Sequence, residues 1–436
     1  MATTYYGFTQ SHYTPAEVVL EDIRESEYSI SYLVRLKIMD NTTNIQIRAG
    51  WLIDGSGDPA IKDPVINIAD NKIISIGNKE PEGSIPENHV NYPGCTIIPG
   101  LVDSHVHLAI SGSINKSDRK SQLDLPYGMI KRRIEGHIWD HFKHGILAVR
   151  DGGDRGRNVL RFKSDSHSMD LPVYIAAAGN AWHGSGRYGS FLGRSPEREM
   201  EPADSILNEY VNGIDHIKII NSGLVSLSNY GKETSPHFSM NELKKIVEMG
   251  RGLGLTIMVH ANGNKPVESA IEAGCNSIEH GFFMGEDNLK RMADNRVVWV
   301  PTVNTMEAIR KMSLPGSREY EIASKNIYHQ IGQVEKAIRY GVTIAVGTDS
   351  GSPGVNHGYS IIKEMNLLMS GGFSVEKIIE AGSHIGSRLF KNASVPVLLK
   401  KNAPATFLVV NGTPQHLPEA LDSIRAIWIN GIIKKK

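Results

Sequence analysis

The chain has 436 residues, of which 47 are basic and 47 acidic, so its formal net charge is zero. This balance gives nucleic-acid binding little electrostatic support, and no apolar run approaches the roughly 20 residues of a membrane span. Two cysteines, Cys95 and Cys275, are too few for a disulfide framework, and the first residues carry no apolar targeting segment; we therefore expect a cytoplasmic protein.

Residues 1–44 form a predicted N-terminal arm. Thr14 and Pro15, followed by Glu17, indicate the start of a helix, because proline is favoured in the first helical turn. The helix would pack on its own subunit or clasp a neighbouring one, and the sequence does not decide between these alternatives. We expect a homo-oligomer in either case.

Short apolar runs at both ends of the chain predict a small β-sandwich domain. Between residues 45 and 98 such runs alternate with turn residues, and Asn71 and Lys72 before the run 73–77 indicate a hairpin. Residues 400–436 contain similar runs. Each end offers too few strands for an independent domain, so we expect the two segments to form one composite domain.

Residues 99–399 alternate strands with helices. The strand-like runs lie at 99–107, 146–151, 173–178, 216–220, 255–260, 277–280, 297–301 and 342–349. Ser239 is a good helix cap, and apolar residues at helical spacing follow it over 240–253. Eight strands with intervening helices predict an α/β fold with a (β/α)8 TIM-type barrel.

The first of these runs, Pro-Gly-Leu-Val-Asp-Ser-His-Val-His, ends with two histidines two residues apart. Because side chains alternate along a strand, His105 and His107 point to the same face and can reach one metal ion. Two solvated polar residues on a strand face would give the same pattern. The pair alone therefore does not establish a metal site.

Other strands of the predicted barrel also end in polar residues. The fifth ends at His260, the sixth at His280 and the eighth at Asp349, while Lys218 lies inside the fourth. Singly, these are explained by core histidines, a helix cap and a lysine that reaches solvent. Together they gather at the mouth of a barrel, and imidazole and carboxylate are usual ligands of zinc. The sequence therefore predicts a metal site.

The chain resembles the amidohydrolase superfamily from about residue 45 to its end. The motifs that carry the resemblance are the run at 99–107, Val-Arg-Asp at 149–151, His-Ala-Asn-Gly at 260–263, Glu-His-Gly at 279–281 and Gly-Thr-Asp-Ser-Gly at 347–351. Within the superfamily the chain is most similar to the imidazolonepropionase-related branch, which includes prolidase-like dipeptidases. The resemblance implies a metal-dependent hydrolase of a small-molecule substrate.

The resemblance also implies a site with two divalent metal ions, usually zinc. His105, His107 and Asp349 would hold one ion, and His260 and His280 would hold the other. The chemistry implied is hydrolysis of an amide-type C–N bond by a hydroxide that the two cations make available near neutral pH.

Three further residues have implied roles. Lys218 would be carboxylated by carbon dioxide and bridge the ions, which removes the cost of a buried cation. Asp349 would take the proton of the attacking water and pass it to the leaving nitrogen. His183, in a His-Gly loop after the third strand, would contact the substrate carbonyl or the oxyanion, or else be a surface histidine.

Two departures from the family pattern bear on the substrate. Deaminases and imidazolonepropionases carry a glutamate where Gly263 stands here, which favours the lysine-bridged pair of ions. Phe238 lies where prolidase-like relatives often have a tyrosine that can meet a substrate carboxylate. Arg187, Tyr188 or Tyr230 would take over that role.

The substrate class stays open. Dipeptides, N-acyl amino acids, carbamates and arylureas all contain a suitable C–N bond, and the same hydroxide would attack an ester or a lactone. A protein that binds metal without catalysis is a further alternative. The complete ligand set argues against it, because structural metal sites usually lack an open position.

Overall fold

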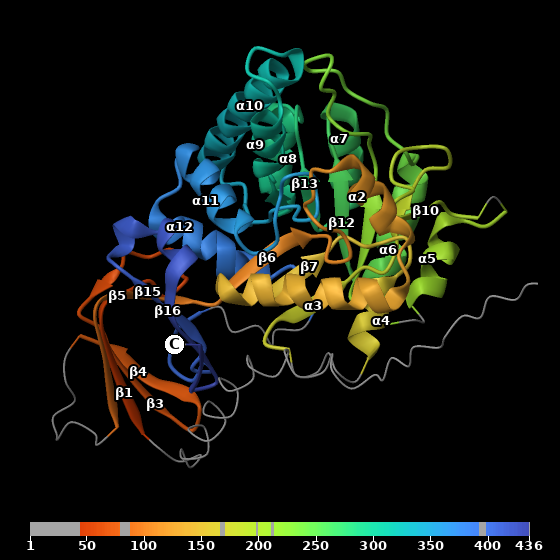
Figure 1. The fold of residues 1–436 in the computed structure, drawn as a ribbon. Helices are drawn as coiled ribbons and strands as arrows, with labels where there is room; N and C mark the ends of the chain where they lie inside the picture. Colours follow the sequence, from red (N-terminus) through yellow and green to blue (C-terminus); the bar gives the residue numbers. More distant parts are fainter. Residues whose placement is uncertain are drawn as a thin grey trace, which may run out of the picture.

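The computed structural model describes residues 44–78, 88–165, 171–197, 199–210, 213–391 and 398–435. The predicted N-terminal arm, with its helix, lies outside them except for residue 44. Figure 1 shows an α/β body of strands wrapped by helices, and a separate group of strands at one end where the C-terminus lies.

The separate group is one mixed sheet built from both ends of the chain. Its strand order is β17-β16-β15-β5-β1-β3-β4, with β2 paired to β1. The strands are β1 (Ile45–Leu52), β2 (Ile61–Lys62), β3 (Val65–Ala69), β4 (Lys72–Gly77), β5 (His89–Pro99), β15 (Phe407–Asn411), β16 (Ile424–Ile429) and β17 (Ile432–Lys435). The predicted pairing of the two ends and the β3–β4 hairpin are confirmed. The described strands make one sheet here, and a sandwich is not shown.

Both faces of this sheet are buried where β5 pairs with β15. Ile97 and Val409 pack with the other side chains of the mixed sheet. Their neighbours Ile98 and Leu408 point the opposite way and belong to the large core of the α/β body. The alternation along the strands therefore joins the sheet to the body through shared apolar packing.

The α/β body contains two parallel sheets. One has the order β6-β7-β8 and the other the order β10-β9-β11-β12-β13-β14. The strands are β6 (Leu101–Val106), β7 (Ile146–Asp151), β8 (Tyr174–Ala177), β9 (Ala181–His183), β10 (Gly193–Arg194), β11 (His216–Ile220), β12 (Thr256–Ala261), β13 (Ser277–His280) and β14 (Val298–Val300). Seven of the eight predicted strands are present, and the parallel sheets fit a TIM-like barrel.

The eighth predicted strand, 342–349, is not a regular strand. Ile344 forms a single parallel bridge with Trp299, and Ser350 forms one with Val106. Gly347 lies so close to its neighbours that a Cβ atom would sit 3.0 Å from the backbone nitrogen of His105. The segment therefore lies between β14 and β6, and the backbone N–H of Asp349 donates to the carbonyl oxygen of His105 at 2.7 Å.

Helices cover the outside of the parallel strands (Figure 1). They are α2 (Lys116–Ser121), α3 (Tyr127–Lys143), α4 (Asn158–Ser164), α5 (Pro202–Tyr210), α6 (Met240–Gly252), α7 (Asn264–Ala273), α8 (Glu286–Asn295), α9 (Asn304–Met312), α10 (Arg318–Tyr340), α11 (Ser360–Ser370) and α12 (Val375–Glu380). The α6 helix begins after Ser239, which forms a capping box with Glu242, as the cap residue predicted. None of the helices in the described ranges has the length and apolar character needed to cross a membrane.

Candidate metal centre

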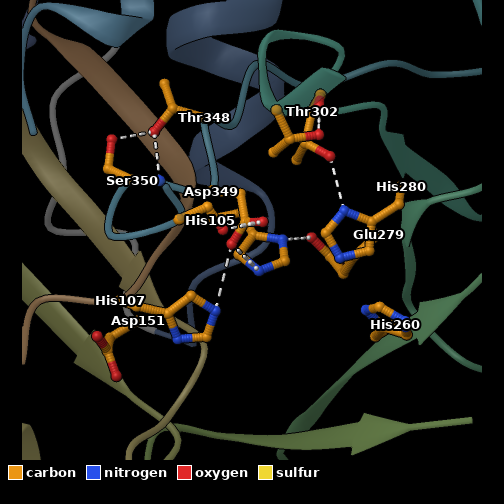
Figure 2. Close-up of polar contacts among 12 residues, drawn as sticks. His105, His107, Asp151, His260, Glu279, His280, Thr302, Thr348, Asp349 and Ser350 are labelled. Atoms are coloured by element: carbon orange, nitrogen blue, oxygen red, sulfur yellow. Dashed lines mark hydrogen bonds and ion pairs between the residues drawn. The ribbon is translucent and has the colours of Figure 1, made fainter. Parts of the chain in front are cut away.

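Two histidines and one aspartate converge where β6 and the segment after Gly347 end. The Nε2 atoms of His105 and His107 lie 3.5 and 3.3 Å from Oδ1 of Asp349. Figure 2 shows the two imidazoles turned toward this carboxylate. One ligand atom from each residue lies within 4.8 Å of the other two, and all three residues are largely buried. This donor set fits a divalent metal ion such as zinc.

The ring nitrogens that face away from this group have partners of their own. Nδ1 of His105 lies 2.9 Å from Oε2 of Glu279, and Nδ1 of His107 lies 3.1 Å from the carbonyl oxygen of Gly153. An Nδ1–H that donates to such an acceptor leaves Nε2 without a proton. This arrangement is typical of metal-binding histidines, because it fixes the tautomer and the ring orientation.

The second predicted pair of histidines lies next to the first group. The ring centroids of His260 and His280 are 4.5 Å apart, and those of His280 and His105 are 5.0 Å apart. His280 is oriented by Thr302, whose Oγ1 lies 2.7 Å from its Nδ1. In Figure 2 His280 and His260 lie on the side of His105 that is opposite to His107. The structure thus brings the four predicted histidines together.

Lys218 enters this cluster from the middle of β11. Its Nζ atom lies 3.3 Å from Nε2 of His105, and its side chain is almost completely buried. No carboxylate in the described ranges forms an ion pair with it. Burial lowers the pKa of the Lys218 amine to about 8, partly opposed by the negative charges of Glu279 and Asp349.

Burial also sets the charge of the histidines. It lowers the pKa of His105 to about 4, with the charge of Lys218 acting in the same direction, and it lowers the pKa of His280 to about 3. Both imidazoles are therefore neutral near pH 7. The neutral form is the one that binds a metal ion.

A buried ion pair that the sequence reasoning did not assign supports His105. Nη2 of Arg150, on β7, donates to Oε1 of Glu279 at 2.6 Å, and its Nε donates to the carbonyl oxygen of Ser104 at 2.9 Å. Burial alone would raise the pKa of Glu279, but Arg150 and the hydrogen bond from His105 hold it below its usual range. Arg150 lies in the motif Val-Arg-Asp and Glu279 in the motif Glu-His-Gly. A charged side chain inside a buried strand needs a partner of opposite charge.

Asp349 is held from the other side by its chain neighbours. The backbone N–H of Thr348 donates to Oδ1 of Asp103 at 2.9 Å, and its hydroxyl donates to Oδ2 at 2.6 Å. The hydroxyl of Ser352 donates to Oδ2 of Asp349 at 2.8 Å. These bonds fix the carboxylate in front of the two histidines.

Unusual backbone conformations gather at this site. His280, Thr302 and Asp349 have φ angles of 68°, 49° and 57°, in the left-handed region that non-glycine residues rarely adopt. Each such residue costs on the order of 1 kcal/mol or more and persists only where the surroundings impose it. Strain of this kind is typical of functional sites.

The cluster opens into a cavity of about 490 Å³. This volume is within the usual range of small-molecule sites, roughly 300 to 1,000 Å³. The metal-site residues line one part of it, and most of the remaining lining is apolar. The apolar residues are Ile110, Phe191, Leu192, Ile220, Leu224, Val225, Leu227, Phe282, Met306, Ile309, Met312 and Pro353.

The residues predicted to contact the substrate differ in whether they line the cavity. Tyr188 lines the cavity, and its ring centroid lies 5.6 Å from that of His260. Arg187, Tyr230 and His183 are not among the described residues that line it. His183 is buried at the end of β9, paired in register with Ile220. The roles of these residues therefore stay predictions.

Comparison with known proteins agrees with this site. Residues 96–435 match the model of the Amidohydrolase family. Ochratoxinase from Aspergillus niger is 24% identical over 417 residues, covering 88% of this chain and 83% of that protein. Imidazolonepropionase from Geobacillus thermodenitrificans is 24% identical over 311 residues, covering 64% of each chain.

A solved structure shows the same fold. The crystal structure of a Xaa-Pro dipeptidase with bound methionine in its active site superimposes with a TM-score of 0.77 at 24% identity, covering 90% of this chain and 100% of that one. The family match spans well over half of the chain and includes the six residues of the cluster. The protein is therefore a member of the amidohydrolase family and, as predicted, a hydrolase.

Proposed function

We propose that this protein hydrolyses an amide-type C–N bond of a small molecule, and that the reaction depends on two divalent metal ions, with zinc the expected metal. The observation that carries the proposal is the grouping of His105, His107 and Asp349, whose ligand atoms lie within 4.8 Å of one another beside the cavity. His260 and His280 are the proposed ligands of the second ion. Ochratoxinase, imidazolonepropionase and the Xaa-Pro dipeptidase support the type of bond by their similarity.

Lys218 is proposed to carry a carboxyl group. Its neutral amine would attack the carbon of carbon dioxide, form an N–C bond and lose a proton, which gives an anionic group with two oxygens. The position of Nζ, 3.3 Å from Nε2 of His105, supports this role. An anion here also avoids an unpaired ammonium inside the site.

Divalent ions bound at this site would supply Lewis acidity and lower the pKa of a water molecule. The chain's own residues supply the remaining functions. Asp349, whose Oδ1 faces both histidines, is the proposed carrier of the proton from water to the leaving nitrogen. Glu279 is a positioning residue, because it fixes the ring of His105. The apolar walls would hold the organic part of the substrate away from water.

The proposal is tested by removing metal with a chelator, restoring zinc, and assaying each form on dipeptides, N-acyl amino acids, carbamates and arylureas. We expect hydrolysis of at least one of these classes that disappears on chelation and returns with zinc. If the protein hydrolyses only esters or lactones in a parallel panel, its substrate is another activated carbonyl compound and not an amide. Metal-loaded protein that cleaves no compound would contradict catalysis.

A further inference from the structure

One cation of the cavity wall belongs to no part of the metal centre. Arg119 lies on α2 and lines the cavity. Its Nη1 donates to the carbonyl oxygens of Ser111, Ser113 and Gly351, each at 3.2 Å. These contacts tie the guanidinium to two loops, one of which carries Asp349. The group is therefore held in a fixed orientation beside the metal centre.

The other nitrogens of this guanidinium, Nε and Nη2, have no hydrogen bond or ion pair with any residue in the described ranges. The side chain is only partly exposed. Burial lowers the pKa of Arg119, and the negative charge of Asp349, which also lines the cavity, opposes this shift. Because an arginine remains charged at any ordinary pH, Nε and Nη2 are two donors of a cationic group that are available to an acceptor.

No ion pair joins this guanidinium to a residue in the described ranges, and Asp349, the acidic residue of the cavity lining, faces His105 and His107. Apart from Arg119 and Lys218, no lysine or arginine of the described chain lines the cavity. The facing walls from α9 and the 224–227 segment are apolar, with Leu224, Met306 and Ile309 among their residues. The cavity thus combines the positive charge of Arg119 with a broad apolar surface.

We propose that Arg119 binds a carboxylate of the substrate through Nε and Nη2, so that the preferred substrates are amides with a free carboxylate near the scissile bond and an apolar side chain. The inference rests on the proposed amide hydrolysis and narrows its substrate class. Paired N–H donors of a guanidinium match the two oxygens of a carboxylate. Gly351, which accepts a hydrogen bond from Arg119, is two residues from Asp349, and this places the carboxylate close to the reacting carbonyl.

Phe238, at the position where prolidase-like relatives often have a tyrosine, cannot bind a substrate carboxylate. Phe238 is buried, is not among the described residues that line the cavity, and has no polar atom in its side chain. Arg119 therefore supplies, from a different element, the donor that Phe238 lacks.

The test compares two matched compounds, N-benzoyl-L-phenylalanine and its C-terminal carboxamide, which both release benzoate on hydrolysis. We expect the zinc-loaded wild-type protein to prefer the acid. Arg119→Gln should raise KM for the acid about 10- to 100-fold, as expected for loss of a charge-assisted contact, with a much smaller change for the carboxamide. Arg119→Lys should restore part of the preference.

A control and a binding measurement separate the possible outcomes. Arg133→Gln removes an arginine of α3 that does not line the cavity and should leave the preference unchanged. Calorimetric binding of both compounds to the zinc-loaded protein provides a readout that needs no turnover. If the acid binds more tightly only when Arg119 is present, the inference holds even where neither compound is cleaved, and the wider panel of amides, carbamates and arylureas then decides the proposed hydrolysis. Equal binding of acid and carboxamide, or an equal loss of both in Arg119→Gln, would contradict the carboxylate site.

Discussion

In the proposed centre Lys218 bridges the two ions; its Nζ lies 3.3 Å from Nε2 of His105, and its charge also acts on His280. We predict that Lys218→Ala loses most of the bound metal and at least about 100-fold in activity. A loss of this size is expected when a group that takes part in proton transfer or metal binding is removed. Short carboxylic acids should restore part of both by occupying the space of the missing group.

Metal content by mass spectrometry and rate measurements with added acetate or propionate check this prediction. Lys244→Ala is the matched control, because Lys244 is exposed on α6. A Lys218→Ala protein that still holds two ions per chain would rule out the bridge.

Asp349 has two proposed roles, metal ligand and proton carrier, which a single substitution can separate. Asparagine keeps one oxygen for a metal ion but cannot carry a proton as a carboxylate does. We predict that Asp349→Asn retains part of the metal and loses turnover by about 100-fold or more. The exposed Asp294 of α8 gives the control Asp294→Asn, which should behave as wild type. Near-normal turnover in Asp349→Asn would refute the proton-transfer role.

Helix α9 supplies apolar residues of the cavity. A buried carboxylate accepts hydrogen bonds from the backbone at its N-terminus. Glu364 of α11 accepts hydrogen bonds from the backbone nitrogens of Val303 and Asn304 at 3.0 and 2.7 Å. Burial nevertheless raises the pKa of Glu364 to about 8. Because the folded state holds its proton more tightly than the unfolded state, this group stabilises the fold at low pH, and the contribution is lost as pH rises from about 4.5 toward 8.

Substitution by glutamine removes this titration. We predict that the free energy of unfolding of the wild type, measured with metal chelated, decreases between pH 5 and pH 9 relative to that of Glu364→Gln. The expected decrease is at least about 1.4 kcal/mol, which corresponds to a pKa shift of one unit. Urea unfolding across this range measures it. Glu307→Gln on α9 is the control, because its ion pairs with Arg310 and Lys311 outweigh burial and hold the pKa of Glu307 below its usual value, outside this pH window. Parallel stability curves for wild type and Glu364→Gln would show that burial does not shift this group.

Elements also show how far the sequence could predict this site. Strand ends were predictable, because an apolar run that stops at a histidine marks both the element and the position of its polar end, as in β6 and β12. The composition of the 342–349 segment predicts a strand, but its pairing with β14 and β6 is limited to single bridges, at Ile344 and at Ser350 directly after it. The partners of the ligands depend on distant residues: no local pattern in the sequence connects Glu279 with His105, and none directs Arg119 toward the cavity.

At the scale of the molecule, the mixed sheet and the α/β body share a core. Leu408 of β15 is fully buried in the large apolar cluster of the body. We predict that Leu408→Ala lowers the free energy of unfolding by about 2 to 5 kcal/mol and that the sheet and the metal centre unfold in one transition. Tryptophan fluorescence and zinc release, followed together during denaturation, test this. Leu314→Ala, at a residue that is 79% exposed, should change stability by less than about 0.5 kcal/mol. Two separate transitions would contradict the shared core.

We propose that six side chains from five segments of the α/β body hold a pair of metal ions. Anomalous diffraction at the zinc edge, from crystals of the zinc-loaded protein, tests it most directly. We predict two peaks, one among His105, His107 and Asp349 and one between His260 and His280, with extra density extending from Nζ of Lys218 between them. A map with no peak at these residues, or with a single peak and an unmodified Lys218, would contradict it.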